Sequence, residues 1–343
     1  MASTSSAPFV SAVITSESLA SKHGRYESEG FCFIRGFLTA EALGYLRERV
    51  AHVWSHMHAD VQRGWIMNLH QVLPREDNWM WKLATDPRIL EIVRMHYGPD
   101  FVFNSSQILV KPPTTEDAAG GREVPWHQDG QIIRTLWICL DDVDETNGGL
   151  VVKPGWHTRG NLRKRVAEHP EQCLQGTAQY APGQASKPQP GALLKEIDID
   201  AYCPEGGRAE WESGTVQYRL KAGDCAMHHP SVPHRSLPNA SADAWRRIII
   251  LRYLPARFPR PAARFHQHWE SAVLFEKESF LVSGDDVGAQ GMRRTPWEEC
   301  SVPSSSSTES SDDAGADAVA PPPKGAGGGA GGQSGALPLL PPK

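Results

Sequence analysis

The feature that most constrains the fold is a series of short, β-branched or alternating apolar segments. These segments lie at 101–113, 135–143, 148–155, 215–229 and 246–255. Glycine, proline, asparagine and aspartate separate them, as turns separate the strands of a sandwich or barrel. Because helical patterns precede the series, the chain is predicted to be an α+β protein, mainly β, with a β-sandwich core.

Two helices are predicted before these strands, after a short strand at 31–34. The first begins after Thr39, a common N-cap residue, and its apolar residues recur at helical spacing. The second covers 86–98, with Asp86 as its cap, a proline in its first turn and Gly98 at its end. These helices are expected to flank the β core on its N-terminal side.

Composition predicts the limits of the folded domain. Residues 1–21 are rich in serine, threonine and alanine, and we interpret them as a flexible leader. Residues 301–343 contain no aromatic residue and are predicted to be a disordered tail. The domain then covers 22–300, and a long, polar, irregular insertion at about 158–213 is expected over one mouth of the sandwich.

Charge and hydropathy exclude several classes of partner. The formal net charge is -5, with 35 lysine and arginine residues against 40 acidic ones, so the chain has no basic excess for nucleic acid. No apolar run approaches the roughly 20 residues that span a bilayer. The first residues lack the charged start and apolar centre of a secretory signal, so we expect no secretion. We expect a cytoplasmic protein, a monomer or weak homo-oligomer, with organellar import as the alternative. The six cysteines are scattered and predicted to be free thiols rather than zinc ligands or disulfides.

The segment Trp-His-Gln-Asp-Gly places His127 and Asp129 two positions apart after a proline. In an extended chain such side chains point the same way, so one strand end supplies two ligands. Two histidines and one carboxylate form the facial triad of non-haem Fe(II) oxygenases. Downstream, the third ligand is to be sought among His228, His229 and His234.

An arginine pair, Arg246 and Arg247, opens the most apolar strand. A guanidinium in such a strand needs a partner, and a planar dicarboxylate cosubstrate supplies a bidentate one. The alternative is that one arginine faces solvent and the other pairs with a surface acid. For one of the two, this alternative is the expected arrangement.

Five segments in order carry a family resemblance: YESEGFCFIRGFLTAEALGYLRERV, ILVKPP, WHQDG, LDDVDETNGGLVVKPGWH, and HPSVPHRSLPN followed by RR. Over most of residues 24–255 the chain resembles the phytanoyl-CoA dioxygenase family of Fe(II)/2-oxoglutarate-dependent oxygenases. The resemblance implies a double-stranded β-helix (jelly-roll, cupin-like) core, one Fe(II), 2-oxoglutarate as cosubstrate and O2. It also implies that the metal ligands are His127, Asp129 and His234, and that His229 lies near the site without being a ligand.

The resemblance further implies a set of cosubstrate-binding residues. The arginine that binds the distal carboxylate of 2-oxoglutarate falls on Arg246, but one extra residue after Asn239 keeps Arg247 as the alternative. Strands that line the cosubstrate pocket in similar proteins correspond here to those that carry Gln107, Lys111 and Thr135.

The implied activity is hydroxylation of an unactivated C–H bond of a small-molecule or acyl substrate, with release of succinate and CO2. Related halogenases leave the carboxylate position free for chloride, so Asp129 favours hydroxylation. Desaturation or cyclisation would use the same ligands. Two other classes stay open: a non-catalytic jelly-roll ligand-binding protein, and a cupin-like metal isomerase or hydrolase. The sequence does not identify the substrate.

Other conspicuous residues have simpler interpretations. His157 ends a turn-rich segment, and packing accounts for it better than catalysis does. Trp126 and Trp137 flank the motif and are expected to pack in the core, although either could wall a pocket. A basic group at the start of the insertion is expected to be a solvated face, with an anionic substrate as the alternative: Arg159, Arg163, Lys164 and Arg165.

Overall fold

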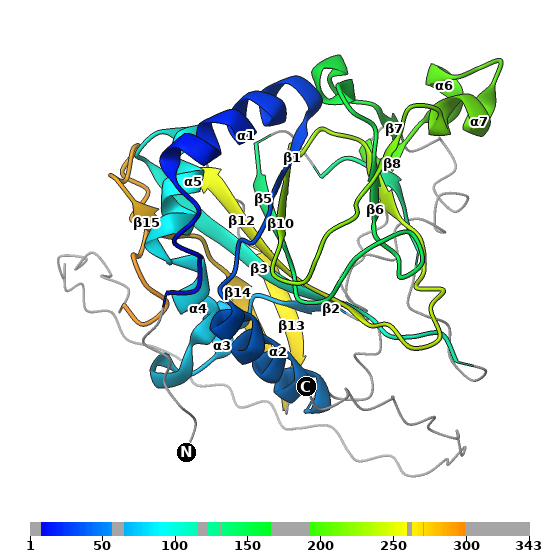
Figure 1. Ribbon diagram of the computed structural model, residues 1–343. Helices are drawn as coiled ribbons and strands as arrows, with labels where there is room; N and C mark the ends of the chain where they lie inside the picture. Colours follow the sequence, from blue (N-terminus) through cyan, green and yellow to red (C-terminus); the bar gives the residue numbers. More distant parts are fainter. Residues whose placement is uncertain are drawn as a thin grey trace, which may run out of the picture.

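The structure is a computed structural model that describes residues 8–56, 65–115, 123–129, 132–165, 193–258, 263–269 and 271–298. Within these residues, two antiparallel sheets face each other, and helices cover the outer side of one of them (Figure 1). The major sheet has the strand order β1-β10-β5-β12-β3-β15, with β2 also beside β3. The minor sheet has the order β7-β8-β4-β11-β6-β9. The prediction of a mainly β, α+β protein with N-terminal flanking helices is confirmed.

The strands of the major sheet are β1 (Phe31–Ile34), β2 (Trp65–Met67), β3 (Phe101–Lys111), β5 (Arg134–Cys139), β10 (Cys225–His228), β12 (Arg246–Pro255) and β15 (Phe280–Ser283). Those of the minor sheet are β4 (Val124–His127), β6 (Leu150–Val152), β7 (Arg163–Arg165), β8 (Leu193–Ile197), β9 (Val216–Gln217) and β11 (His234–Ser236). A separate hairpin consists of β13 (Ala263–Trp269) and β14 (Ser271–Lys277). Each segment predicted as a strand thus contains at least one strand.

The helices are α1 (Ser16–Glu29), α2 (Ala40–Ser55), α3 (Leu69–Val72), α4 (Trp79–Ala84), α5 (Pro87–Tyr97), α6 (Ile199–Tyr202) and α7 (Gly207–Glu212), with 3-10 turns η2 (Arg75–Asp77) and η3 (Trp156–Arg159). The Thr39 hydroxyl accepts a hydrogen bond from the backbone N–H of Ala42 at 3.1 Å. The Asp86 carboxylate accepts one from the backbone N–H of Arg88 at 2.9 Å. Both predicted caps are confirmed, and so are the two predicted helices, α2 and α5. None of the described helices is long and apolar enough to cross a membrane.

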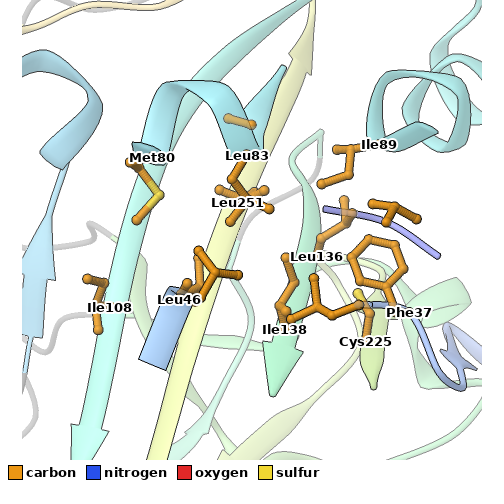
Figure 2. Close-up of a cluster of buried hydrophobic side chains, with 14 of the residues drawn as sticks. Phe37, Leu46, Met80, Leu83, Ile89, Ile108, Leu136, Ile138, Cys225 and Leu251 are labelled. Atoms are coloured by element: carbon orange, nitrogen blue, oxygen red, sulfur yellow. The ribbon is translucent and has the colours of Figure 1, made fainter. Parts of the chain in front are cut away.

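The main hydrophobic core lies between the helices and the outer face of the major sheet. Figure 2 shows Leu46 of α2 and Leu83 of α4 beside Leu251 of β12, and Ile89 of α5 beside Leu136 of β5. All five side chains are fully buried. Burial of this size is worth about 1.5–3 kcal/mol for each such side chain relative to exposure. The helices therefore cover the outer face of the major sheet, and its inner face is available for a functional site.

The inner face of the major sheet points toward the minor sheet. Directly opposed residues of antiparallel strands share a face, and Ile250 of β12 is opposed to both Gln107 and Trp137. Ile250 and Trp137 pack with Leu150 and Val152 of β6, so this face lies between the sheets. Because side chains alternate along a strand, the same face carries all of the following polar residues: Gln107, Lys111, Thr135, His228, Arg246 and Arg252.

Two predicted boundaries differ from the structure. The prediction of a flexible leader over 1–21 is wrong for residues 8–21, because Val10 is fully buried and bridges Leu38, and α1 begins at Ser16. The helix was not predicted because this segment is rich in polar residues. The buried side chain of Leu19 holds α1 on the domain. Residues 1–7 and the predicted tail at 301–343 lie outside the described residues.

The predicted insertion at 158–213 is also more regular than expected. Its described parts form β7 and β8, which extend the minor sheet beside β4, and the helices α6 and α7. Trp211 of α7 packs against Trp126 of β4, with ring centroids 5.7 Å apart, in a small hydrophobic cluster. The apolar residues of this cluster are scattered along the chain, so no periodic pattern in the sequence predicts the cluster. Its residues 166–192 lie outside the described ranges.

Candidate metal centre

Three of the predicted residues converge between the two sheets. His127 ends β4, Asp129 follows two residues later, and His234 begins β11. The two histidines are directly opposed across the β4–β11 pair, and their ring centroids lie 4.0 Å apart. Asp129 carboxylate oxygens lie 3.9 Å from the Nε2 atom of each histidine. One ligand atom from each residue therefore falls within 4.8 Å of the others, a spacing that a single metal ion could bridge.

The orientation of both imidazoles suits metal binding. Nδ1 of His127 lies 2.8 Å from the carbonyl oxygen of Pro125, and Nδ1 of His234 lies 2.9 Å from that of Val232. A carbonyl only accepts, so each Nδ1 carries the hydrogen and each Nε2 presents a lone pair toward Asp129. Burial, followed by the charges of His127 and His228, lowers the pKa of His234 well below its usual value. His234 is therefore neutral at pH 7, as a metal ligand must be.

Asp129 is held by a residue that the sequence reasoning missed. Arg252 of β12 donates a hydrogen bond from a terminal guanidinium nitrogen to the Asp129 carboxylate at 2.8 Å. The Asp129 backbone N–H also donates to the Pro230 carbonyl oxygen at 2.8 Å. The signal was present, because Arg252 lies six residues after Arg246 and an even spacing in a strand puts both side chains on one face.

His228 and His229 separate into different environments. His228 lies on the inner face, and its Nε2 atom is 3.9 Å from the Asp129 carboxylate, so it borders the centre from the major sheet. The ring of His229 lies 5.1 Å from that of His157 and 6.0 Å from that of Tyr26, outside the described metal-ligand group. His157 itself contacts the carbonyl oxygen of Glu27 through Nε2 at 3.0 Å, which ties η3 to α1.

A pair of buried cations lies on the same inner face. Arg246 and Lys111 are directly opposed across β12 and β3, and they are only 2% and 4% exposed. Lys111 donates a hydrogen bond to the Ser236 hydroxyl of β11 at 2.9 Å, so it reaches the minor sheet two residues from His234. Burial, followed by the charge of Arg246, lowers the pKa of Lys111 to about 6. Burial also lowers the pKa of Arg246 to about 10.

The two arginines of the pair have different partners. Arg247 forms a bidentate contact with Asp141, with its Nε atom 2.8 Å from the carboxylate. Arg246 lies over the Trp137 ring at 5.9 Å, and its buried Nε has no hydrogen-bond partner. Within the described residues, no carboxylate lies within salt-bridge distance of Arg246 or Lys111. This arrangement favours Arg246 over Arg247 as the anchor of an anionic ligand.

The remaining predicted residues lie on the same face. Thr135 is fully buried and its hydroxyl has no hydrogen-bond partner. Gln107 is opposed to Ile250 and half-buried. Trp137 faces this site, whereas Trp126 packs on the other side of the minor sheet with Trp211. Of the basic group at 159–165, Arg159 stacks on the Trp156 ring at 3.9 Å.

Comparisons with known proteins identify relatives of this chain. The protein is 30% identical over 190 residues to the peroxisomal phytanoyl-CoA dioxygenase of Bos taurus, covering 53% of this chain and 48% of that one. It is 27% identical over 186 residues to a probable alpha-ketoglutarate-dependent hypophosphite dioxygenase of Stutzerimonas stutzeri, covering 51% and 52%. The chain spans about half the length of these two relatives. It also matches the 1-deoxypentalenic acid 11-beta-hydroxylase of Streptomyces exfoliatus, with 24% identity over 242 residues and 64% and 74% coverage.

Solved structures show the fold. The non-heme monooxygenase ThoJ in its apo form matches with a TM-score of 0.53 and 21% identity, covering 80% of this chain and 88% of that one. EctD from S. alaskensis matches with a TM-score of 0.51 and 16% identity, covering 75% and 84%. The predicted jelly-roll core is thereby confirmed.

The family follows from a match to a sequence profile that covers more than half of the chain. The sequence profile described as Phytanoyl-CoA dioxygenase (PhyH) matches residues 26–248, which include the whole metal centre and the buried cation pair. The chain therefore belongs to the phytanoyl-CoA dioxygenase family.

Proposed function

We propose that this protein is an Fe(II)- and 2-oxoglutarate-dependent dioxygenase that hydroxylates an unactivated C–H bond of a small-molecule or acyl substrate. One observation carries the proposal: a two-histidine, one-carboxylate group lies between the sheets together with two buried basic side chains, Arg246 and Lys111, that have no carboxylate partner among the described residues. A protein that binds only a metal needs the two histidines and the carboxylate. A protein that also binds a dianionic chelator of that metal, such as 2-oxoglutarate, needs the two basic side chains as well.

The cation pair is suited to the distal carboxylate of 2-oxoglutarate. Burying a cation without a partner is costly, so an anionic ligand there is stabilised by relief of that cost. Arg246 offers a planar fork to a carboxylate. Lys111, already fixed by Ser236, has a pKa of about 6 and is largely neutral at pH 7 without a ligand, so it adds a point charge when a bound anion favours its protonated form. The unpaired Thr135 hydroxyl supplies a further donor on the same face.

The three proposed metal ligands leave coordination positions for the reactants. His127, Asp129 and His234 would hold Fe(II), and positions on the metal would remain for 2-oxoglutarate and O2. When bound, the metal would supply the oxidative decarboxylation of 2-oxoglutarate by O2 to succinate and CO2, coupled to oxidation of a substrate C–H bond. Arg252 orients Asp129, and the two Nδ1 hydrogen bonds fix both imidazoles. The apolar residues between the sheets, such as Ile248 and Ile250, exclude water from the reacting centre.

The substrate class is drawn from the relatives. Their names include a phytanoyl-CoA dioxygenase and a 1-deoxypentalenic acid 11-beta-hydroxylase, so we propose an acyl or small carboxylic-acid substrate. The residues that would select it lie in the segment at 158–213 and in the N-terminal helices. Desaturation or cyclisation would use the same residues, and the position of the target C–H bond decides between these outcomes.

The competing proposal is a jelly-roll protein that binds a ligand without oxidising it. Such a protein has no need for the complete triad, the Arg252 contact to Asp129 and the cation pair together. All three are present here. A cupin-like isomerase or hydrolase, for its part, has no need for the Arg246 anchor.

A succinate-release assay tests the proposal. The full chain is incubated with Fe(II), 2-oxoglutarate, O2 and a panel of acyl-CoAs and small carboxylic acids, and anaerobic calorimetry measures binding of Fe(II) and then 2-oxoglutarate. We expect 2-oxoglutarate to bind only in the presence of metal, and succinate to rise with one class of substrate. His127→Ala should abolish both readouts. A wild-type chain that binds neither Fe(II) nor 2-oxoglutarate refutes the proposal, and turnover that survives Arg246→Ala refutes the assigned anchor.

A further inference from the structure

A second group of metal-ligand side chains lies on the helical side of the molecule. His23 and Glu27 are one turn apart on α1, and His96 is in the last turn of α5. The two helices lie next to each other (Figure 1). The proposed iron site is built from strand ends between the sheets, so the two groups share no residue.

The spacing of the donor atoms matches a single small cation. The Nδ1 atoms of His23 and His96 are 3.2 Å apart. Two nitrogens bound to one tetrahedral zinc at 2.0–2.1 Å are separated by about 3.3 Å. A Glu27 carboxylate oxygen lies 3.9 Å from each of the two Nδ1 atoms, and this side chain is 54% exposed and free to close the remaining gap.

The surroundings of His96 suit a metal ligand. Its side chain is only 4% exposed and packs against the Tyr26 ring, with centroids 4.6 Å apart. Without metal, one Nδ1–H donates to the other Nδ1 across the 3.2 Å contact. Zinc binding requires the donating histidine to move its hydrogen from Nδ1 to Nε2, so that both Nδ1 lone pairs face the cation.

The surroundings restrict which cation fits. Lys22 lines the hollow beside His23 and His96, and the charge of Arg134 acts on His96, while only Glu27 contributes a negative charge to the group. Calcium and magnesium require several oxygen ligands, which this group lacks. Zinc binds imidazole nitrogen and carboxylate oxygen readily. The hollow is also lined by Cys32 and Met95.

We propose that His23, Glu27 and His96 form a second metal site, selective for zinc over magnesium and calcium, that links α1 to α5. Three protein ligands and one water complete a tetrahedral coordination. Because the unfolded chain does not hold the ligands together, bound zinc stabilises the packing of α1 on the domain. This inference does not rest on the proposed dioxygenase activity.

Zinc binding to the full chain tests the proposal, with the proposed iron site removed by His127→Ala and His234→Ala. Equilibrium dialysis with metal analysis should give one zinc per chain, and neither magnesium nor calcium should bind. His23→Gln or Glu27→Gln, both at partly exposed positions, should weaken zinc binding at least tenfold and abolish the zinc-dependent rise in Tm. The matched control is His56→Gln, in another helix-end histidine pair with His52 on α2, which should change neither readout.

The wild-type chain provides a second measurement that does not depend on the iron-site variants. It should bind two zinc ions, and Glu27→Gln should bind one. Zinc affinity that is unchanged by both His23→Gln and Glu27→Gln, or a wild-type stoichiometry that Glu27→Gln does not alter, overturns the proposal. Equal binding of magnesium overturns the selectivity.

Discussion

Replacing Arg246 with methionine should make the empty protein more stable and remove 2-oxoglutarate binding. Methionine retains an apolar chain against Trp137 but removes the buried charge. Burial lowers the pKa of Arg246 from its usual value to about 10, a fall of more than two units. At about 1.36 kcal/mol per pKa unit, this difference corresponds to about 3 kcal/mol against the charged form. The side chain is 2% exposed, so solvent screening is small.

The sign follows from proton binding. Between pH 10 and the usual arginine pKa, the unfolded chain binds more protons at this position than the folded chain does. The destabilisation is therefore complete below pH 10 and fully present at pH 7. The free energy of unfolding of Arg246→Met should therefore rise by about 1–3 kcal/mol, the lower figure allowing for local rearrangement. The KM for 2-oxoglutarate should rise at least a hundredfold, because two charge-assisted hydrogen bonds of about 1.5–3 kcal/mol each are lost.

Urea unfolding without ligands and succinate release with varied 2-oxoglutarate measure the two effects. The matched control is Arg247→Met, which leaves the Asp141 carboxylate without its bidentate partner. It should lower the free energy of unfolding by about 3–5 kcal/mol and change the KM little. If Arg246→Met leaves the KM unchanged, or if the two variants have the same effects, the assignment of the two arginines is wrong.

Three further predictions follow from single contacts. The pKa of Lys111 lies near 6 in the folded chain rather than at 10.5, so the unfolded chain binds more protons between these two values. The free energy of unfolding should therefore rise with pH from 6 to 10.5. Urea unfolding at a series of pH values measures this rise, and Lys111→Met should flatten it. Arg252→Met should weaken Fe(II) binding by about 10–100-fold through Asp129, measured by anaerobic calorimetry, whereas Arg257→Met at an exposed position should not. Thr39→Ala should cost about 1 kcal/mol of stability in urea and leave succinate release unchanged, because it removes only the α2 cap.

Local patterns account for what could be predicted from the sequence. Turn residues, β-branched runs and caps depend on neighbours in the chain, so α2, α5 and the long strands β3 and β12 lie close to the predicted positions. The triad was predictable as well, because His127 and Asp129 share a strand end and the family resemblance supplied His234. Contacts between distant segments were harder. Nothing near Ser16 indicates that α1 packs on the domain, and the Trp126–Trp211 contact joins residues 85 positions apart in the sequence.

The three arginines of β12 show why a strand position carries more information than a residue type. Arg246 and Arg252 are six residues apart and share the inner face, while Arg247 lies between them in the sequence but on the opposite face by alternation. Arg247 forms an ion pair with Asp141 and Arg252 forms one with Asp129, whereas no carboxylate among the described residues lies within salt-bridge distance of Arg246. A buried guanidinium without a carboxylate partner is costly. This cost supports the proposal that Arg246, rather than Arg247 or Arg252, anchors an anionic ligand.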